Sequence, residues 1–147
     1  MKMISSLIGG LAGAAALNIL HQAVKQFAHD APRVDFVGEE ALSKGLEKIG
    51  VEPPTGNALF STTMAADLIS NAAYYGLIGF GKKKNLLLAG AASGLAAGIG
   101  AVKLTKPLGL SDAPVTRTIP TKLMTVAWYT IGGLVAGSVM YALRKKS

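Results

Sequence analysis

Four long stretches of apolar residues dominate the chain, and short polar segments separate them. They run from Met3 to about Val24, from Leu59 to Phe80, from Leu86 to about Leu104 and from Leu123 to Leu143. Each approaches or exceeds the roughly 18 to 20 residues that an α-helix needs to cross a hydrocarbon core about 30 Å thick. The pattern predicts an all-α, polytopic membrane protein with four transmembrane helices, in which residues 1–147 form a single membrane domain.

The first apolar stretch also resembles a secretory signal peptide, because Lys2 precedes it and it contains Ala14-Ala15-Ala16. The apolar run continues beyond those alanines, however, and reaches about Val24. We therefore expect this stretch to remain in the protein as a transmembrane helix.

A shorter helix is expected between the first two stretches, from Val37 to Ile49. Apolar and charged residues occupy opposite sides at helical spacing, with Val37, Ala41, Leu42, Leu46 and Ile49 on one and Glu39, Glu40, Lys44, Glu47 and Lys48 on the other. Gly50 provides a stop signal, and Pro53-Pro54 prevents continuation. This amphipathic helix is expected to lie on the outer membrane surface or to cap the bundle. The segment from Leu110 to Pro120 is expected to be an extended turn.

The composition fits a lipid-facing surface and excludes several classes of chemistry. Half of the residues are hydrophobic, only 16% are charged and the mean hydropathy is positive, which is unusual for a soluble domain of this size. The chain has no cysteine and only two histidines, which excludes thiol chemistry and argues against a histidine-rich metal site. It also lacks a phosphate loop and a nucleophile elbow. We therefore expect no catalytic residue, no cofactor and no metal, and an enzyme is the least favoured class.

The basic residues predict orientation in a membrane better than they predict nucleic-acid binding. The formal net charge is +7, yet lysines and arginines lie at the ends of apolar runs and not along one helix face. Lys2 and the clusters Lys82-Lys83-Lys84 and Arg144-Lys145-Lys146 contain no acidic residue, whereas the other loops mix both charges. The positive-inside rule then places both termini in the cytoplasm, with membrane lipids as partners and no nucleic acid.

The two halves of the chain share three short matches in the same order. Gly10-Leu11-Ala12 matches Gly94-Leu95-Ala96, Asp30-Ala31-Pro32 matches Asp112-Ala113-Pro114, and Ala73-Tyr74-Tyr75 matches Ala127-Trp128-Tyr129. These matches indicate two tandem helical hairpins, residues 1–81 and 82–147, with the amphipathic helix inserted in the first copy. Chance similarity between helices rich in small residues stays open as the alternative.

Glycines recur at every fourth residue on three of the four stretches. The rows are Gly9 and Gly13, then Gly90, Gly94 and Gly98, and finally Gly133 and Gly137. Such rows let helices approach one another closely inside lipid. Packing within the chain is their ordinary use, and a partner helix is a second use because a bundle this small cannot bury every row without becoming very compact.

Polar residues gather on one face of each of the first two stretches. They are Asn18, His21, Gln22 and Lys25 on the first, and Thr63, Asp67, Ser70, Asn71 and Tyr74 on the second, of which Asp67, Ser70 and Asn71 form the candidate site with the residues of the first. A carboxylate at the bilayer centre costs about 2.5 to 3.5 kcal/mol, so Asp67 needs protein or water around it and a partner, for which His21, Lys25, Lys103 and Lys122 are candidates. The cluster is either an ion, proton or solute site, or a hydrogen-bonded group that fixes helix register, and the second interpretation is favoured.

Small-residue stretches, the turn Asp30-Ala31-Pro32-Arg33 and the pair Trp128-Tyr129 together resemble the pattern of small, uncharacterised four-helix membrane proteins of bacteria. The resemblance implies a bacterial inner membrane and carries no activity. The expected function is a non-enzymatic membrane subunit or scaffold that packs through its glycine and alanine rows against other transmembrane proteins or itself. The alternative is a small transporter or channel with its polar site around Asp67.

Overall fold

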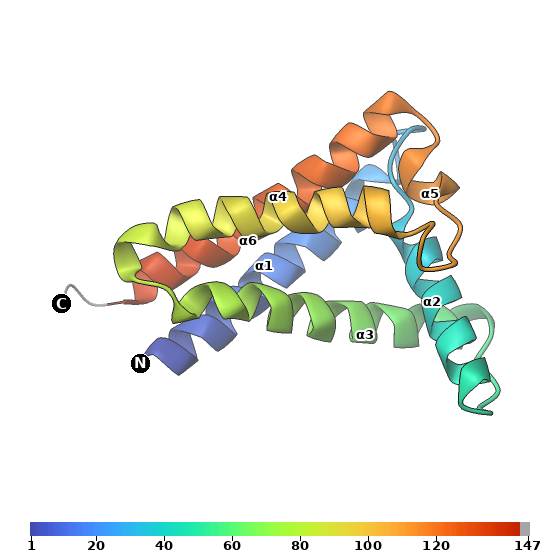
Figure 1. The fold of residues 1–147 in the computed structure, drawn as a ribbon, viewed down its shortest axis with the longest axis horizontal. Coiled ribbons are helices and arrows are strands. Elements are labelled where there is room, and N and C mark those ends of the chain that lie inside the picture. The colour runs from blue at the N-terminus through green and yellow to red at the C-terminus, as the bar shows by residue number, and fades with distance from the viewer. Residues whose placement is uncertain (145–147) are drawn as a thin grey trace.

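Helices make up most of the computed structural model, which describes residues 1–144 (Figure 1). In chain order they are α1 (Lys2–Val24), α2 (Val34–Lys48), α3 (Gly56–Gly76), the short 3₁₀ helices η1 (Leu77–Phe80) and η2 (Lys83–Asn85), α4 (Leu86–Leu104), α5 (Ala113–Thr116) and α6 (Ile119–Leu143). No strand occurs among the described residues, so the prediction of an all-α fold is confirmed. Lys145 and Lys146 of the predicted basic cluster lie outside the described residues.

Three segments are long and apolar enough to cross a membrane: Lys2–Val24, Lys83–Leu104 and Ile119–Leu143. The fourth predicted stretch, Leu59 to Phe80, is helical as α3 and η1, but α3 is not among those three. Asp67, Asn71 and several hydroxyl side chains lower its hydropathy. By length and composition the structure therefore supports three membrane spans, and α3 is a long helix of lower hydropathy.

Local capping explains where the observed helices differ from the predicted ones. Helix α6 begins at Ile119 instead of Leu123, because the Thr118 hydroxyl accepts a hydrogen bond from the Thr121 amide (3.1 Å) and Pro120 occupies the first turn. Helix α2 covers Val34–Lys48 where Val37 to Ile49 was predicted. Gly50 follows with a φ of 76°, a conformation that glycine adopts without strain and that commonly ends a helix.

Helices α1 and α6 pack against each other at the centre, with α3 on the outer side of α1 and α4 on the outer side of α6. The α3 and α4 helices meet near η1 and η2 and diverge toward their other ends (Figure 1). Both ends of the described chain lie at the same end of the bundle as η1 and η2, whereas α2 and α5 lie at the opposite end. The packed pairs that follow one another in the chain are α1 with α3 and α4 with α6.

Contacts between the two Asp-Ala-Pro turns hold the α2 and α5 end together. The Arg33 amide donates to the Pro114 carbonyl (3.0 Å), and the Arg117 guanidinium donates to the Ala31 carbonyl (2.9 Å). Thr121 adds a hydrogen bond from its hydroxyl to the Asp30 carbonyl (2.7 Å). These bonds join the two halves through backbone atoms.

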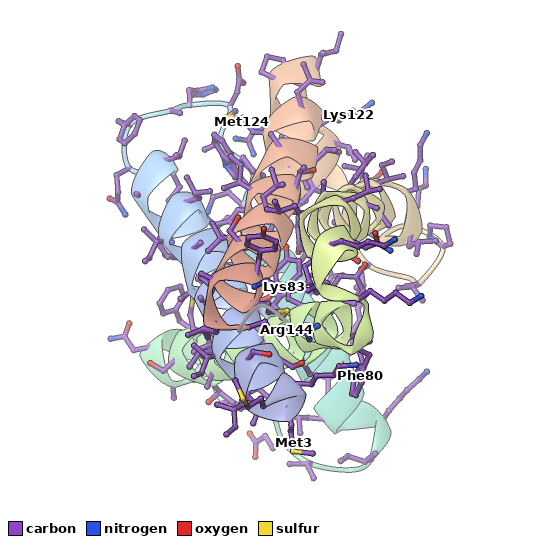
Figure 2. All side chains as sticks on the ribbon, turned by 90° about the vertical axis from the view of Figure 1, so that its left-hand side faces the viewer. Met3, Phe80, Lys83, Lys122, Met124 and Arg144 are labelled. Atoms are coloured by element: carbon purple, nitrogen blue, oxygen red, sulfur yellow. The ribbon has the colours of Figure 1, made fainter. Side chains whose placement is uncertain are left out.

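The opposite end is joined through Arg144, which is buried although it carries a charge. Its guanidinium donates to the carbonyls of Gly79 and Gly81 and to the Ser5 hydroxyl, and its own carbonyl accepts from the Lys83 ammonium. Figure 2 looks toward this end and shows Lys83 and Arg144 beside each other. The arginine therefore links the start of α1, η1 and the end of α6.

The interior is built mainly from small residues, and large apolar side chains point outward. The buried cluster consists of Leu17, Tyr75, Ile78, Leu86, Tyr129, Ala136 and Met140. Exposed large apolar residues on the three apolar spans include Ile4, Leu7, Leu11, Ile19, Leu88, Leu95, Ile99, Ile131 and Leu134. Soluble monomers rarely expose this much contiguous apolar surface, so the distribution is the one expected of helices that face lipid.

Candidate functional site

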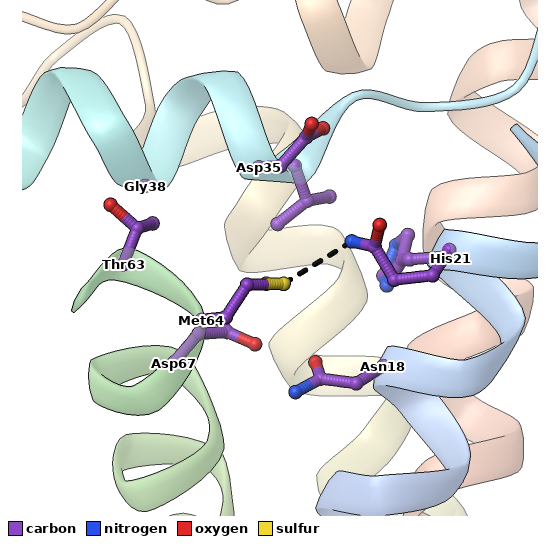
Figure 3. Close-up of a pocket in the computed structure, with 9 residues that line it drawn as sticks. Asn18, His21, Asp35, Gly38, Thr63, Met64 and Asp67 are labelled. Atoms are coloured by element: carbon purple, nitrogen blue, oxygen red, sulfur yellow. Dashed lines mark hydrogen bonds between the residues drawn. The ribbon is translucent and has the colours of Figure 1, made fainter. Parts of the chain in front are cut away.

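A narrow crevice lies where α1, α2 and α3 meet, at the end of the bundle opposite the termini (Figure 3). Its lining residues are Asn18, His21 and Gln22 from α1, Val34, Asp35 and Gly38 from α2, and Thr63, Met64 and Asp67 from α3. Helical spacing places the α1 and α3 residues on facing sides, and α2 crosses above them. The polar faces predicted for the first two stretches therefore meet.

Asp35 lies at the α2 side of the crevice and is fully paired. Its carboxylate accepts from the Arg33 guanidinium at 2.7 and 3.0 Å and from the Lys25 ammonium at 3.5 Å. Burial favours the neutral acid, but the hydrogen bonds and charges of Arg33 and Lys25 outweigh it and hold the pKa of Asp35 below its usual range. Asp35 is therefore ionised at neutral pH and anchors the start of α2.

Asp67 lies deeper, on α3, and no lysine, arginine or histidine within residues 1–144 forms an ion pair with it. Its carboxylate accepts a hydrogen bond from the Asn71 amide (3.0 Å). Among the candidate partners, Lys25 pairs with Asp35, whereas Lys103 and Lys122 line a separate hollow beside α4 and α6. His21 alone of the four candidates lines the same crevice as Asp67.

Two buried polar atoms at the crevice have no hydrogen-bond partner: His21 Nε2 and Thr63 Oγ1. His21 is only 8% exposed and Thr63 only 3% exposed. The crevice has room of about 10 Å³, which is about what one water molecule requires. Figure 3 shows His21 and Thr63 on opposite sides of the crevice, with the hydrogen bond between Gln22 and Met64 lying between them, so one water serves at most one of these two atoms. In this conformation the crevice has no room for a solute larger than water.

The structure brings together most, but not all, of the predicted polar residues. Asn18, His21, Gln22 and Asp67 line the crevice, Lys25 reaches Asp35 at its side, and Asn71 bonds Asp67 from the next turn. Ser70 lies on the exposed face of α3 and does not line the crevice.

Thr63, which the sequence places on the same helix face as Asp67 at a spacing of four residues, also lines the crevice. Asp35 was not predicted as part of the site. For Asp35 no local signal exists, because its place depends on how α2 crosses the other two helices.

All seven predicted packing glycines lie at close contacts within the chain. Gly90, Gly94 and Gly98 of α4 face Gly133, Gly137 and the residues around Tyr129 on α6, and Gly9 and Gly13 of α1 face Met140 and Gly132 of α6. A methyl group added at Gly98, for example, would lie 2.6 Å from the Val126 Cα atom. Backbone approach of this kind leaves no space for a further helix at these rows.

A comparison with protein-family models, with curated proteins and with solved structures finds no match to this chain.

Proposed function

We propose that this chain is an integral membrane protein with four membrane-crossing helices, α3 being the fourth. Helix α3 runs antiparallel to α1 along nearly its whole length. Near one end the Gln22 amide donates to the Met64 sulfur (3.3 Å), and toward the other end Gly10 approaches the Ala72 carbonyl and Gly79 approaches Ser6. If α1 crosses the bilayer, α3 must cross beside it. The outward-pointing large apolar residues of α1, α4 and α6 support this placement.

We propose further that both termini lie on the cytoplasmic side, and the distribution of basic residues supports this orientation. Lys2 and the Lys82-Lys83-Lys84 cluster lie at the end of the bundle that holds both termini, and the Asp-Ala-Pro turns with their mixed charges lie at the other. Basic clusters next to spans remain on the cytoplasmic side.

We infer that the protein is a non-enzymatic membrane subunit or scaffold whose docking surface is the outward face of α3. One observation carries this inference: the predicted glycine rows are all occupied within the chain, whereas α3 leaves a small-residue row exposed. That row consists of Ala58, Thr62, Ala66 and Ser70, all at a spacing of four residues. Rows of small and hydroxyl residues stabilise contacts between helices in lipid through close approach.

The position of this row also favours a helical partner. Tyr74, the next residue of the row, donates from its hydroxyl to the Ser93 carbonyl of α4 (2.8 Å). The row thus begins beside α4 at Tyr74, and the helices α3 and α4 diverge toward their other ends (Figure 1). Polar side chains that face lipid cost free energy, so a helix that carries them is stabilised when another transmembrane helix covers it.

Cysteine cross-linking in the native membrane tests this proposal, since the chain has no cysteine of its own. A Ser70→Cys variant labelled with a thiol-reactive photo-cross-linker, whose activated group inserts into C–H bonds of any neighbouring side chain, should give one defined adduct on illumination. An adduct of twice the chain mass indicates self-association, and another defined mass indicates a second subunit. Adding Ala66→Leu should abolish the adduct because the larger side chain prevents close approach.

Leu134→Cys on α6 is the matched control, because Leu134 is exposed on a helix whose glycines are already packed. It should give no defined adduct. The same adduct from both positions, or no adduct from Ser70→Cys in the membrane of origin, would contradict docking at α3.

The crevice supports a second candidate, a small proton or cation transporter, because His21 Nε2 and Thr63 Oγ1 are buried without partners beside Asp67. Transport requires the crevice to open beyond room for one water. In proteoliposomes, Asp67→Asn should abolish proton or sodium flux, whereas Ser70→Ala should leave it unchanged. Flux that survives Asp67→Asn removes this carboxylate from any transport route.

A further inference from the structure

A second hollow lies at the same end of the bundle as α2, but in the other half of the chain. It is formed where α4 ends, α5 passes and α6 begins, and its lining residues are Val102, Lys103, Lys106, Pro107, Asp112, Thr116 and Lys122. The hollow is a depression of about 510 Å³ that is open to the surface and not an enclosed cavity. Its size suits a phosphate with its ester substituents.

The charge of this hollow is mainly positive and is not neutralised by nearby carboxylates. Lys103, Lys106 and Lys122 converge on it from three segments, and Asp112 is the single acidic residue of the lining. Within residues 1–144 none of these lysines forms an ion pair. Three ammonium groups around one open space attract a compact, doubly or singly charged anion.

The first half of the chain shows how such charges are otherwise satisfied. Lys25 and Arg33 lie at the corresponding end of α1, and the carboxylate of Asp35 from α2 pairs with both. The second half has the single turn α5 in place of α2, and Asp112, which precedes this turn and lines the hollow, forms no ion pair with a lysine among residues 1–144. An anion in the hollow would therefore neutralise Lys103 and Lys106 as the carboxylate of Asp35 neutralises Lys25.

We propose that this hollow binds a phosphate group, carried by the headgroup of an anionic phospholipid. Lys103 lies at the end of the apolar segment Lys83–Leu104, and Lys122 lies at the start of Ile119–Leu143. The neighbouring Leu104 and Leu123 are 56% and 65% exposed, so apolar surface begins beside the lysines. A phospholipid matches both features, since its phosphate meets the ammonium groups while its chains lie along the leucines. The α3 docking face takes no part in this site.

Native mass spectrometry of the purified protein in detergent tests the proposal. Phosphatidylglycerol and phosphatidylcholine are titrated separately, and the population with one bound lipid is followed. A basic side chain near an anionic lipid surface strengthens binding by roughly fivefold. The variant K103Q/K106Q/K122Q should therefore bind phosphatidylglycerol at least roughly tenfold more weakly than the unmodified chain. Phosphatidylcholine should bind weakly to both.

The control variant is K48Q/K82Q/K84Q, which removes the same charge from exposed lysines away from the hollow. It should retain phosphatidylglycerol binding. Equal losses in both variants, or no preference for phosphatidylglycerol over phosphatidylcholine, would overturn the proposal.

Inorganic phosphate distinguishes a lipid headgroup from the free anion. If millimolar phosphate displaces phosphatidylglycerol from the unmodified chain and binds without lipid, and K103Q/K106Q/K122Q loses that binding, the hollow is a site for free phosphate and the lipid assignment is wrong. If phosphate does not compete while phosphatidylglycerol remains selective, the headgroup assignment stands.

Discussion

The close contact between α4 and α6 makes a quantitative prediction for Gly94→Ala. A Cβ atom at Gly94 would lie 2.6 Å from the Thr130 Cα atom and still closer to the Tyr129 carbonyl oxygen. Non-bonded carbon atoms prefer about 3.5 to 4.0 Å, so the two helices would have to separate by about 1 Å. Both contacting atoms belong to the backbone and cannot rotate away. The strain therefore extends to Gly90 and Gly98 in the same row.

The expected cost follows from two opposing terms. Overpacking a close contact costs about 1 to 3 kcal/mol, whereas replacing glycine by alanine within a helix gains about 0.5 to 1 kcal/mol. Gly100→Ala on the same helix isolates the second term, because a Cβ atom there meets only the Leu104 Cδ1 atom at 3.7 Å, an ordinary contact. We expect Gly94→Ala to be less stable than Gly100→Ala by about 1 to 3 kcal/mol.

Reversible unfolding in mixed micelles of mild detergent and dodecyl sulfate measures this difference. Trp128 is the single tryptophan and lies partly buried against the core on α6, so its fluorescence reports on the affected helix pair. If Gly94→Ala and Gly100→Ala unfold at the same detergent fraction, α4 and α6 do not pack through this row.

Three further changes test other contacts. Asp35→Asn should destabilise α2. Because Arg33 lowers the pKa of Asp35 in the folded protein, the stabilisation is fully present above the pKa of the unfolded chain, about 3.9, and is lost as pH falls through the lower pKa of the folded protein. Hydrogen exchange of α2 should show this acid-dependent loosening in the unmodified chain and not in the variant. Tyr75→Phe removes the buried hydrogen bond from its hydroxyl to the Tyr129 carbonyl (2.7 Å) and should cost about 1 kcal/mol in the same unfolding assay; an unchanged midpoint would argue against that bond. Arg144→Gln leaves buried carbonyls of η1 and the following turn without their charged donor and should cost about 1.5 to 3 kcal/mol, with faster hydrogen exchange at η1; an unchanged exchange rate there would show that Arg144 does not hold this end.

Most of the helices could be predicted from sequence because their signals are local. The apolar run from Leu86 to Leu104 gives both boundaries of α4, and the alternation of charged and apolar residues gives α2 to within three residues at its start. The single turn α5 could not be predicted, because it forms where the Arg33 amide meets the Pro114 carbonyl. That contact joins residues distant in sequence, and no local pattern encodes it.

The site was predictable only along each helix. Spacing alone places Asn18, His21 and Gln22 on one face of α1 and Asp67 on one face of α3, and antiparallel packing brings these faces together. Pairing between segments was not predictable. Lys25 was a candidate partner for Asp67, but it pairs with Asp35 because α2 crosses the end of α1 and places the Asp35 carboxylate beside the Lys25 ammonium.

For the glycine rows, too, the sequence predicts the contact surface of each helix and not its partner. Spacing of four residues in Gly90, Gly94 and Gly98 predicts close helix approach, and it does not say whether the approaching helix belongs to the same chain. The structure places α6 there. The row on α3 that remains exposed contains alanine, threonine and serine and no glycine, so a search for glycine repeats overlooks it.

One difference between the two halves, the presence of α2 in the first half alone, explains both the closed crevice and the open lysine hollow. In the first half, α2 brings Asp35 to Lys25 and Arg33 and covers the polar ends of α1 and α3. In the second half no such helix intervenes between α4 and α6, so the lysines stay open. An acidic side chain built into the hollow should then perform the function of Asp35 and exclude a bound anion. Thr116 lines the hollow on α5, and Thr116→Glu should weaken phosphatidylglycerol binding although every lysine remains, whereas Thr116→Gln should not. Equal binding by the two variants would mean that the lysines do not act together on one anion.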